Sequence, residues 1–376
     1  MLLLELVITA KVKLYPDFVQ TAQLIETLKA VKAGLNHASR VAYDNGFITS
    51  FKKLQKMTYS DLRQQYGLKS QMACNVCSVV AGSYASMKSN GEKTLAVYKT
   101  PKFQYSYGRD YSFTKNGMLS IGTLDKRIKL PFEIKGMKQY FDGSWNFGTA
   151  TLIYKKDKFF LHIAVKKETP ILEDNSVRNI VGIDFGMNFL AVSYDSAGKT
   201  NFFEGRHIKD KRAKFTKTRK SLQQTKTASS RRRLKKLGNR ENRWMTDINH
   251  KVSKALVSGS IEGTLFVIED LTGIRSQTEK VQRKDRYYSV SWAFYQLRQM
   301  LEYKALRSGS KVVVVDPKYT SQTCPKCGHT EKANRNKNTH TFTCKTCAYT
   351  SNDDRIGAMN LQRKGIEYIA EVMLSV

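Results

Sequence analysis

The chain has 376 residues and carries 64 Lys and Arg against 32 Asp and Glu, which gives a formal net charge of +32. Hydrophobic residues make up 41% and aromatic residues 11% of the chain, which excludes a disordered basic tail and indicates folded domains with sizeable cores. Such a positive excess opposes compaction by self-repulsion, so it predicts a polyanionic partner, nucleic acid in preference to an anionic membrane surface.

The sequence also argues against membrane insertion and secretion. No window reaches about 18 uninterrupted apolar residues, so no transmembrane helix is expected. The first residues, MLLLELVITAKVKLYP, lack a basic leader and a small-residue cleavage site, and their alternation indicates a strand. The six cysteines form three CxxC pairs, which favours a reducing compartment and metal binding over disulfides. We therefore expect a cytoplasmic, nucleoid-associated prokaryotic protein without a membrane partner.

The N-terminal half contains a helical block and a strand-rich block. From about Asp17 to Met87, apolar residues recur at three- and four-residue spacing, which predicts helices. From about Lys99 to Lys166 the pattern changes to short alternating strands, including a hairpin made of residues 149–154 and 159–165. A β-barrel formed by residues 1–16 and 92–172, interrupted by a helical insert at residues 17–91, accounts for both blocks.

The C-terminal half alternates strands with helices and so predicts an α/β sheet domain. The segment IVGIDFGMNFLAVSYDSAGKTNFF is interpreted as two consecutive strands. Residues 206–243 then hold 16 Lys and Arg against two acidic residues. A helix, the buried-type strand TLFVIEDL, a helix over Trp292–Leu306, the strand KVVVVDP, a Cys-rich module and a C-terminal helix complete the order.

Three carboxylates of this half have unusual settings. Asp184 ends an apolar run, Glu269 ends the strand TLFVIE, and Asp354 begins the last helix. An acid in an apolar strand is costly unless it is hydrogen-bonded, protonated or metal-bound. Together the three could hold two divalent cations about 4 Å apart that clamp a phosphodiester. The alternative is that each acid is a cap or a surface residue, with Asp353 and Asp270 able to replace Asp354 and Glu269 in those roles.

The Cys-rich module predicts a structural zinc site. Cys324 and Cys327 form one CxxC pair, Cys344 and Cys347 form another, and 16 residues separate the pairs. Four thiolates at this spacing complete a tetrahedral site and leave no open position for catalysis. The histidines of the module, His329 and His340, are expected to be ordinary surface residues. The remaining pair, Cys74 and Cys77, lies alone in a helical run and is interpreted as helix-core cysteines.

The basic block at residues 206–243 is a candidate nucleic-acid interface. A run of one sign in a basic chain would neutralise phosphates and release counterions. The alternative is a solvated helix face with no partner. The residues expected to contact nucleic acid are Arg231, Arg232, Arg233, Lys235 and Lys236.

Four segments resemble one known family. VGIDFG, FVIEDL, TSQTCPKCG with FTCKTC, and SNDDRIGAMNL are similar to motifs of the TnpB family of transposon-encoded nucleases and of the related compact type V-F CRISPR effectors. The resemblance implies an RNase H-like RuvC nuclease domain at residues 177–320 and 351–376 with a zinc ribbon inserted at residues 321–350. It also implies that the N-terminal barrel and insert are wedge and recognition domains.

The resemblance further implies an RNA-guided DNA endonuclease that cuts double-stranded DNA next to a short motif. Asp184, Glu269 and Asp354 would match the family's catalytic acids and hold two Mg²⁺ ions. The family often has Asn two residues after the last acid, where this chain has Ile356, whereas Asn360 is retained. The alternatives are a compact type V-F CRISPR effector nuclease, a non-cleaving RNA-guided repressor and a strand-transferring transposase. Both a monomer and a homodimer are compatible with the sequence.

Overall fold

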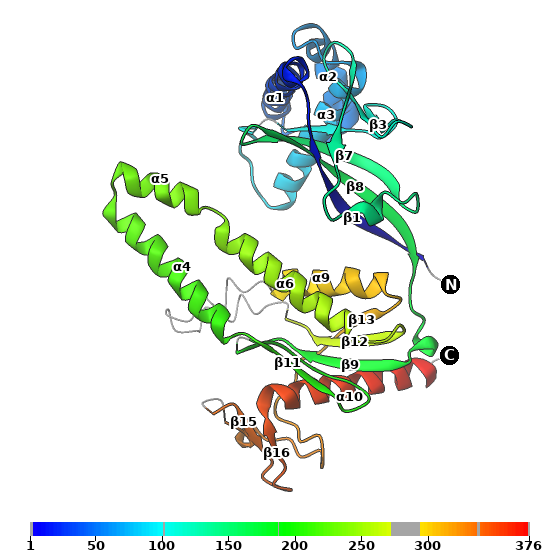
Figure 1. Ribbon diagram of the computed structural model, residues 1–376, viewed down its shortest axis with the longest axis vertical. Coiled ribbons are helices and arrows are strands. Elements are labelled where there is room, and N and C mark those ends of the chain that lie inside the picture. Colours follow the sequence, from blue (N-terminus) through cyan, green and yellow to red (C-terminus); the bar gives the residue numbers. More distant parts are fainter. Residues whose placement is uncertain (1–2, 101, 187, 272–293, 337–338, 375–376) are drawn as a thin grey trace. The chain divides into compact units, whose positions relative to one another are not determined.

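The computed structural model describes residues 3–100, 102–186, 188–271, 294–336 and 339–374 (Figure 1). The chain divides into two compact units, Glu5–Glu168 and Thr169–Val376, the latter together with Met1–Leu4. Among the described residues, no helix combines the length and the apolarity that crossing a membrane would need. Trp292, the expected first residue of a helix, lies outside the described residues.

The first unit contains the helices that the sequence predicts between about Asp17 and Met87. The chain can start its first helix at Phe18 because the Asp17 side chain accepts a hydrogen bond from the Gln20 backbone and the Gln20 side chain accepts one from the Asp17 backbone. Cys77 is fully buried against the Thr58 hydroxyl, 3.3 Å from its Sγ, as expected for a helix-core cysteine, whereas Cys74 is half-buried. The helices are α1 (Phe18–Asp44), α2 (Phe51–Gln64) and α3 (Ser70–Ser89).

Two antiparallel sheets accompany these helices. The predicted hairpin is present as β7 and β8, and its turn residues Lys156 and Asp157 have φ of 51° and 56°. The five-stranded sheet has the order β2-β7-β8-β1-β6, and the three-stranded sheet has the order β3-β4-β5. The strands are β1 (Leu3–Leu14), β2 (Lys102–Tyr105), β3 (Tyr111–Phe113), β4 (Leu119–Gly122), β5 (Arg127–Leu130), β6 (Phe132–Glu133), β7 (Asn146–Lys155) and β8 (Lys158–Pro170).

A mixed five-stranded sheet forms the centre of the second unit, with the order β11-β10-β9-β12-β13. β10 runs antiparallel to both β9 and β11, whereas β12 runs parallel to both β9 and β13. The prediction of two strands between residues 180 and 203 is wrong, because the nearly continuous apolar run before the turn at Gly198 (φ +81°) is divided into two strands, β9 and β10. The strands are β9 (Asn179–Asp184), β10 (Phe189–Tyr194), β11 (Thr200–Glu204), β12 (Thr264–Glu269) and β13 (Lys311–Val315).

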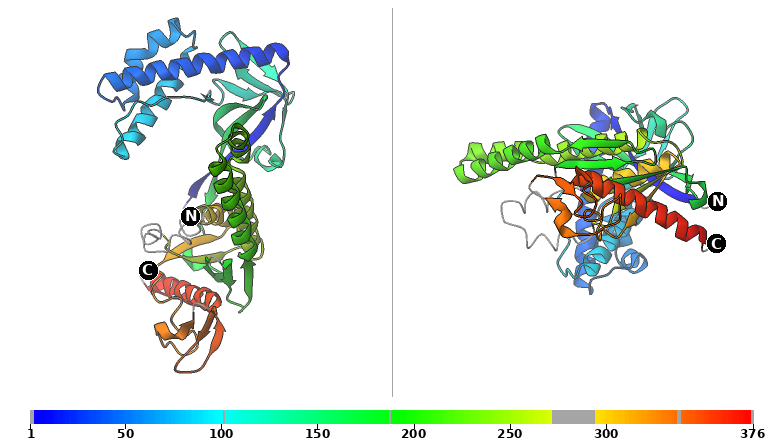
Figure 2. Two further views of the ribbon diagram at one scale, coloured as in Figure 1. Left: turned by 90° about the vertical axis from the view of Figure 1, so that its left-hand side faces the viewer. Right: turned by 90° about the horizontal axis from the view of Figure 1, so that it is seen from below.

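Helices cover both faces of this sheet (Figures 1 and 2). Ile183 and Ile268 pack in one core cluster with α6 and α9, whereas Val267 packs with Leu361 of α10 on the other face. Because successive side chains of a strand point to opposite faces, the position of a residue in its strand decides whether it packs against α6 and α9 or against α10. The helices of this unit are α4 (Arg206–Thr225), α5 (Ala228–Leu237), α6 (Arg240–Ser258), α9 (Phe294–Arg307) and α10 (Asp353–Leu374).

Glycines let α10 lie directly on the sheet. A Cβ at Gly182 of β9 would collide with the backbone oxygen of Ala358, and a Cβ at Gly365 would lie 2.5 Å from Val267 Cγ2. The helix is thus held on β9 at Gly182 and on β12 at Gly365, and a side chain at either position would push it away. These two close contacts fix where the first turn of α10 lies relative to the sheet.

The Cys-rich module lies between β13 and α10 and forms a small antiparallel sheet. Its buried cluster consists of Cys324, Phe342, Cys344 and Ile356, the last contributed by α10. The module is thereby attached to the helix that carries Asp354. Its strands are β14 (Arg335–Asn336), β15 (Thr341–Thr343) and β16 (Thr350–Asn352).

Candidate active site

Two of the predicted acids lie side by side at the carboxyl ends of neighbouring parallel strands. Ile268 of β12 is the register partner of Ile183 of β9, and Glu269 and Asp184 follow them directly. Because the two isoleucines face α6 and α9, alternation turns both carboxylates to the opposite face, where α10 begins.

The third acid reaches the same place from α10. Asp354 lies in the first turn of that helix, and a Cβ built on Gly186, which follows β9, would lie 3.7 Å from Asp354 Oδ2. One turn further along α10, a Cβ on Gly357 would lie 2.7 Å from Asp184 Oδ2. The structure therefore brings together three residues that are 85 positions apart in sequence (269 − 184 and 354 − 269).

The electrostatics of the three carboxylates are those of a crowded, partly desolvated anionic cluster. Burial, followed by the negative charges of Glu269 and Asp354, raises the pKa of Asp184 well above its ordinary value. Burial also raises the pKa of Glu269 and, together with the charge of Asp353, that of Asp354. Like-charged carboxylates in such a setting are stabilised by a bound cation, and hard oxygen donors are the ligands that Mg²⁺ prefers.

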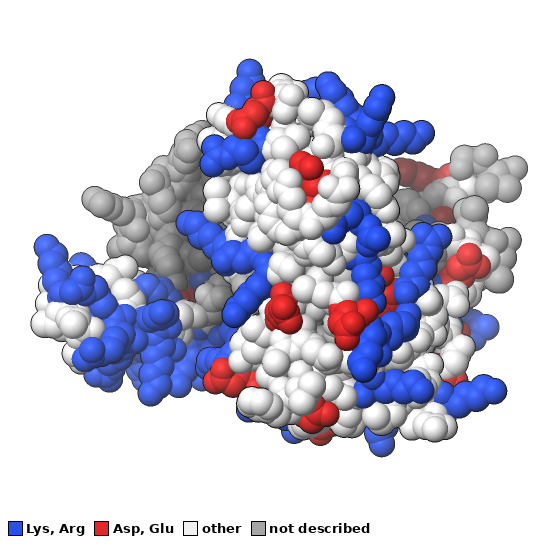
Figure 3. All heavy atoms as spheres, turned by 90° about the horizontal axis from the view of Figure 1, so that it is seen from above, with Lys and Arg blue, Asp and Glu red and all other residues white. Residues whose placement is uncertain are grey.

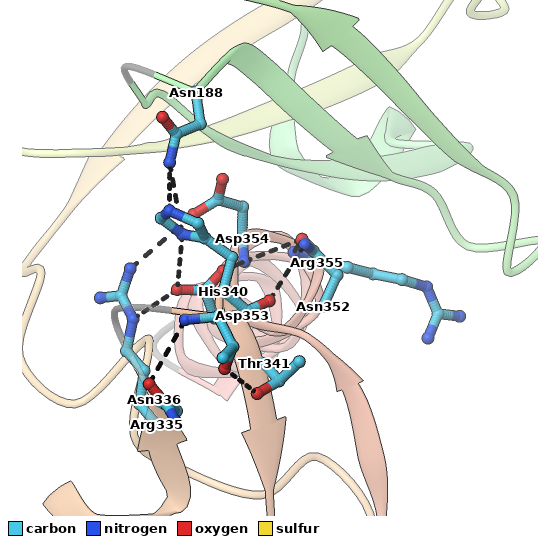
Figure 4. A network of polar contacts seen from close by, with 10 residues as sticks. Asn188, Arg335, Asn336, His340, Thr341, Asn352, Asp353, Asp354 and Arg355 are labelled. Atoms are coloured by element: carbon cyan, nitrogen blue, oxygen red, sulfur yellow. Dashed lines mark hydrogen bonds and ion pairs between the residues drawn. The ribbon is translucent and has the colours of Figure 1, made fainter. Parts of the chain in front are cut away.

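A polar network attaches the Cys-rich module to this cluster (Figure 4). Arg335 Nε donates to Asp353 Oδ2 at 2.8 Å, and Arg335 Nη2 lies 3.8 Å from Asp354 Oδ1. His340 Nδ1 lies 3.6 Å from Asp353 Oδ2, and the same imidazole contacts the Asn188 amide. The sequence predicted an ordinary surface residue at His340, whereas the structure places its side chain in this network. Asp353 is fully buried and accepts the hydrogen bond from Arg335 Nε, whereas Asp354 lies at the longer ion-pair distance from Arg335.

Glu269 is held by a second set of hydrogen bonds. The Thr320 hydroxyl donates to Glu269 Oε1, and Asn360 Nδ2 donates to the backbone oxygens of Thr320 at 2.7 Å and Thr323 at 2.8 Å. Asn360 thus ties α10 to the segment that carries the hydroxyl. Ile356 does not take part, because it is buried in the Cys-rich module. Sequence reasoning missed Thr320, because a threonine four residues before a CxxC pair gives no signal of such a contact.

The four predicted cysteines converge on one point. Their Sγ atoms all lie within 4.8 Å of one another, with 3.6 Å between Cys324 and Cys347 and 3.5 Å between Cys327 and Cys344. Metal–sulfur bonds of about 2.3 Å in a tetrahedron would separate the sulfurs by about 3.8 Å. A backbone N–H from Cys347 lowers the pKa of Cys344, whereas burial and the neighbouring thiols raise the pKa of Cys327. The cluster can hold a metal ion such as zinc.

Basic side chains line a cleft between α4 and α5. The cavity has a volume of about 780 Å³ and includes Arg232, Arg233 and Lys236 of the predicted set, but neither Arg231 nor Lys235. Figure 3 shows Lys and Arg gathered at its left-hand edge, where α4 and α5 lie in Figure 1. Three further basic residues of this cleft, Lys211, Lys214 and Arg240, belong to the predicted basic block at residues 206–243 but not to the five residues expected to contact nucleic acid.

A buried ion-pair cluster fixes the base of this helical pair. Arg212 Nε and Arg219 Nη2 of α4 donate to the two carboxylate oxygens of Glu241 in α6, at 3.2 and 2.8 Å. Arg212 and Glu241 are both buried, so the pair is shielded from solvent and salt. Helix α4 is therefore anchored to α6, and the other Lys and Arg side chains of α4 and α5 extend from this anchored helix pair.

Comparisons with known proteins bear on this arrangement. Residues 162–273 match a family model described as OrfB_IS605, "Probable transposase", and residues 294–361 match a model described as "Cas12f1-like, TNB domain". The chain is 28% identical over 250 residues to TnpB-like protein MJ0751 of Methanocaldococcus jannaschii, covering 64% of this chain and 87% of the relative. The chain resembles the TnpB family, as predicted.

Other relatives of this chain are longer. It is 29% identical over 252 residues to the CRISPR-associated endodeoxyribonuclease Cas12f1 of Sulfoacidibacillus thermotolerans, covering 62% of this chain and 57% of that one. The chain thus spans little more than half the length of its Cas12f1 relatives. A solved structure, the cryo-EM structure of a Cas12f1-sgRNA-target DNA complex, matches with a TM-score of 0.61 at 13% identity, covering 90% of this chain and 82% of that one. At this identity the match shows a shared mixed α/β fold.

Proposed function

We propose that the chain is an RNA-guided DNA endonuclease of the TnpB type, which cuts double-stranded DNA paired with a guide RNA beside a short motif. The observation that carries the proposal is the meeting of Asp184, Glu269 and Asp354 at one sheet edge, in a chain of net charge +32. The names of two similar proteins, an endodeoxyribonuclease and a complex with guide RNA and target DNA, agree with it.

The proposed domains follow the sequence boundaries. Residues 177–320 and 351–376 form an RNase H-like RuvC domain, which is supported by a sheet with three antiparallel strands followed by parallel ones. Residues 321–350 form a zinc ribbon, supported by the four converging thiols. Residues 1–16 and 92–172 form a wedge-like barrel around a helical recognition insert at residues 17–91, supported by the two sheets and three helices of the first unit.

In this proposal Asp184, Glu269 and Asp354 hold two Mg²⁺ ions, which when bound would stabilise charge on the phosphate and activate water. The chain's own residues position the carboxylates. Thr320 orients Glu269 by its hydroxyl, and Arg335 anchors Asp353, the residue next to Asp354. Thr320 directly precedes the ribbon and Arg335 lies within it, so the folded ribbon would support the site without taking part in the chemistry.

Nucleic acid would be held by the basic cleft of α4 and α5, where Arg232, Arg233 and Lys236 contact phosphates. Guide RNA and target DNA are the proposed partners, and base pairing rather than side chains would select the sequence. A compact CRISPR effector with the same chemistry is the second candidate. The presence of all three acids favours a cutting enzyme over a non-cleaving repressor.

The test expresses the chain with its flanking genomic DNA and sequences the RNA that co-purifies. The complex is then given plasmids that carry the matching target beside randomised bases, with and without Mg²⁺. We expect one discrete RNA and Mg²⁺-dependent cutting beside one short motif, which Asp184→Ala abolishes while RNA binding is retained. Target binding without cutting would favour the repressor, and the absence of any bound RNA would overturn the proposal.

A further inference from the structure

A cavity opens where helices α6 and α9 end. The two helices pack against each other, and α6 ends at Ser258 while α9 ends at Arg307. A cavity of about 490 Å³ lies at these ends, and we call it the helix-end cavity. From there the chain continues into β12 and β13, so the cavity lies at the opposite end of β12 from Glu269.

The lining of the helix-end cavity is polar and positively charged. Its described lining residues include no carboxylate. The basic side chains are those of Lys254, Lys304 and Arg307, and hydroxyls come from Ser258, Ser260 and Ser308. A positive cavity attracts small anions, and hydroxyls beside cations supply further hydrogen-bond donors for phosphate oxygens. The volume is sufficient for a small phosphorylated ligand.

The amine of Lys304 is held at the wall of this cavity by α6. Its Nζ donates to the backbone oxygen of His250 at 2.7 Å and to the Ser253 hydroxyl oxygen at 2.6 Å. The Ser253 hydroxyl donates its own hydrogen to the backbone oxygen of Asn249, so its oxygen is the acceptor for Lys304. A neutral amine has two N–H groups and one lone pair. The two contacts use both N–H groups and leave the lone pair for reaction with a ligand in the cavity.

The surroundings of Lys304 favour that neutral form. Burial, followed by the positive charges of Lys254 on α6 and Arg307 on α9, lowers the pKa of Lys304 to about 8. At pH 7 about a tenth of such an amine is neutral, against roughly one part in 2,500 for an ordinary lysine. A desolvated lysine beside other cations is an activated nucleophile. Lys304 therefore combines a reactive amine with a cavity that concentrates anions beside it.

We propose that Lys304 is a modification site, which is acylated by small acyl phosphates bound in the helix-end cavity. The Nζ lone pair attacks the carbonyl carbon, an N–C bond forms, and the C–O bond to the phosphate breaks. The phosphate leaves with that electron pair and takes the proton that the nitrogen loses, so the products are an amide and hydrogen phosphate. No group is oxidised or reduced. Lys254 and Arg307 would stabilise the charge of the leaving phosphate.

The modification site goes beyond the proposed function and does not depend on it. The helix-end cavity shares no described residue with the acid cluster (Asp184, Glu269 and Asp354) or with the cleft of α4 and α5. An amide nitrogen carries one N–H, so an acylated Lys304 loses at least one of its two hydrogen bonds to α6. Acylation would therefore weaken the contact between α9 and α6.

The test treats the full chain with acetyl phosphate and follows the acetylation of each lysine by mass spectrometry of its peptides. Lys254 is the internal control, because it lines the same cavity from an exposed position. A lower pKa makes an amine less nucleophilic, and Lys304 is half-buried, so the gain in rate is smaller than the gain in neutral amine. At pH 7 we expect Lys304 to be acetylated on the order of tenfold faster than Lys254. In the chain unfolded by urea, the two lysines should react at the same rate.

Two further measurements separate the reactive amine from the anion site. Arg307→Gln and, separately, Lys254→Gln remove a charge that lowers the pKa of Lys304, so each should raise the pH at which the rate of Lys304 acetylation levels off. Arg40→Gln, which removes the same charge from an exposed position of α1, should leave that pH unchanged. Inorganic phosphate should slow the reaction of Lys304 with acetyl phosphate but not its reaction with an uncharged acetyl ester.

Three results would overturn the proposal. The first is acetylation of Lys304 in the folded chain at or below the rate of Lys254, and the second is the lack of competition by inorganic phosphate. The third is a pH profile that neither Arg307→Gln nor Lys254→Gln changes, in variants that thermal unfolding shows to be folded. Because no step requires cutting, a chain that proves unable to cleave DNA leaves these measurements intact.

Discussion

Replacing Gly357 by Ala tests whether α10 positions the carboxylate of Asp184. The new Cβ would lie 2.7 Å from Asp184 Oδ2, whereas ordinary contacts begin at 3.4 Å, so one of the two groups must move by 3.4 − 2.7 = 0.7 Å. Because Gly182 and Gly365 fix α10 on the sheet, we expect the carboxylate to move rather than the helix. A misplacement near 1 Å in a catalytic site can cost about 100-fold, so we expect Mg²⁺-dependent cutting to fall between about tenfold and 100-fold.

The folded state should be affected far less than the activity. Alanine is favoured over glycine in a helix by up to about 1 kcal/mol, which offsets part of the crowding. The assay combines cleavage of a matched target under single-turnover conditions with thermal unfolding and a Mn²⁺ titration of the protein. Gly82→Ala is the matched control, since Gly82 is an exposed residue of α3 with no neighbour within 4 Å of the new Cβ. Cutting by Gly357→Ala at the rate of the unaltered chain would refute the reasoning.

Three further predictions concern the residues around the two proposed metal sites. Thr320→Val should reduce cutting on the order of tenfold and raise the Mg²⁺ concentration required, because it removes the hydrogen bond to the charged Glu269. Thr320→Ser keeps the hydroxyl and should retain the cutting rate and the Mg²⁺ requirement of the unaltered chain. Equal loss of cutting in the two variants would contradict a role for the hydroxyl. Cys324→Ser should lose zinc measured by elemental analysis while Cys74→Ser keeps it, and full zinc in the Cys324 variant would disprove the ribbon site. Asp184→Asn should raise the free energy of unfolding by about 1 kcal/mol at pH 8, since it removes a crowded charge. The pKa of Asp184 is higher in the folded than in the unfolded chain, so the unaltered protein gains stability as Asp184 is protonated. The stability difference between Asp184→Asn and the unaltered chain should therefore shrink as the pH is lowered toward 3.8. A difference that grows instead would show that folding lowers the pKa of Asp184.

Local patterns were sufficient to predict the elements on which the site depends. The apolar runs that end in Asp184 and Glu269 are β9 and β12, and the helix predicted after the Cys-rich module begins at Asp353. One strand of the β9–β11 meander was missed because β9 and β10 lie in one nearly continuous apolar stretch, IVGIDFGMNFLAVSY. The polar stretch DSAGK marks the turn before β11, but no comparable break in hydrophobicity separates β9 from β10.

Contacts between distant segments could not be predicted in the same way. Arg335 is one of many basic residues, and nothing in its neighbourhood marks it as the partner of Asp353. The choice of Asp354 over Asp353 rested on the spacing to Asn360. The domain boundaries rested on changes in the residue pattern along the chain and on the resemblance to the TnpB family. Those assignments remain predictions.

The attachment of Arg335 to Asp353 changes how inhibition by chelators should be interpreted. The guanidinium belongs to the same short module as the four thiols, so an agent that strips a metal from the thiols also releases a contact next to the acid cluster. Loss of cutting after such treatment would then have two origins, one at each centre. Adding back Mg²⁺ alone should restore only one of them, and recovery should require zinc to be supplied first.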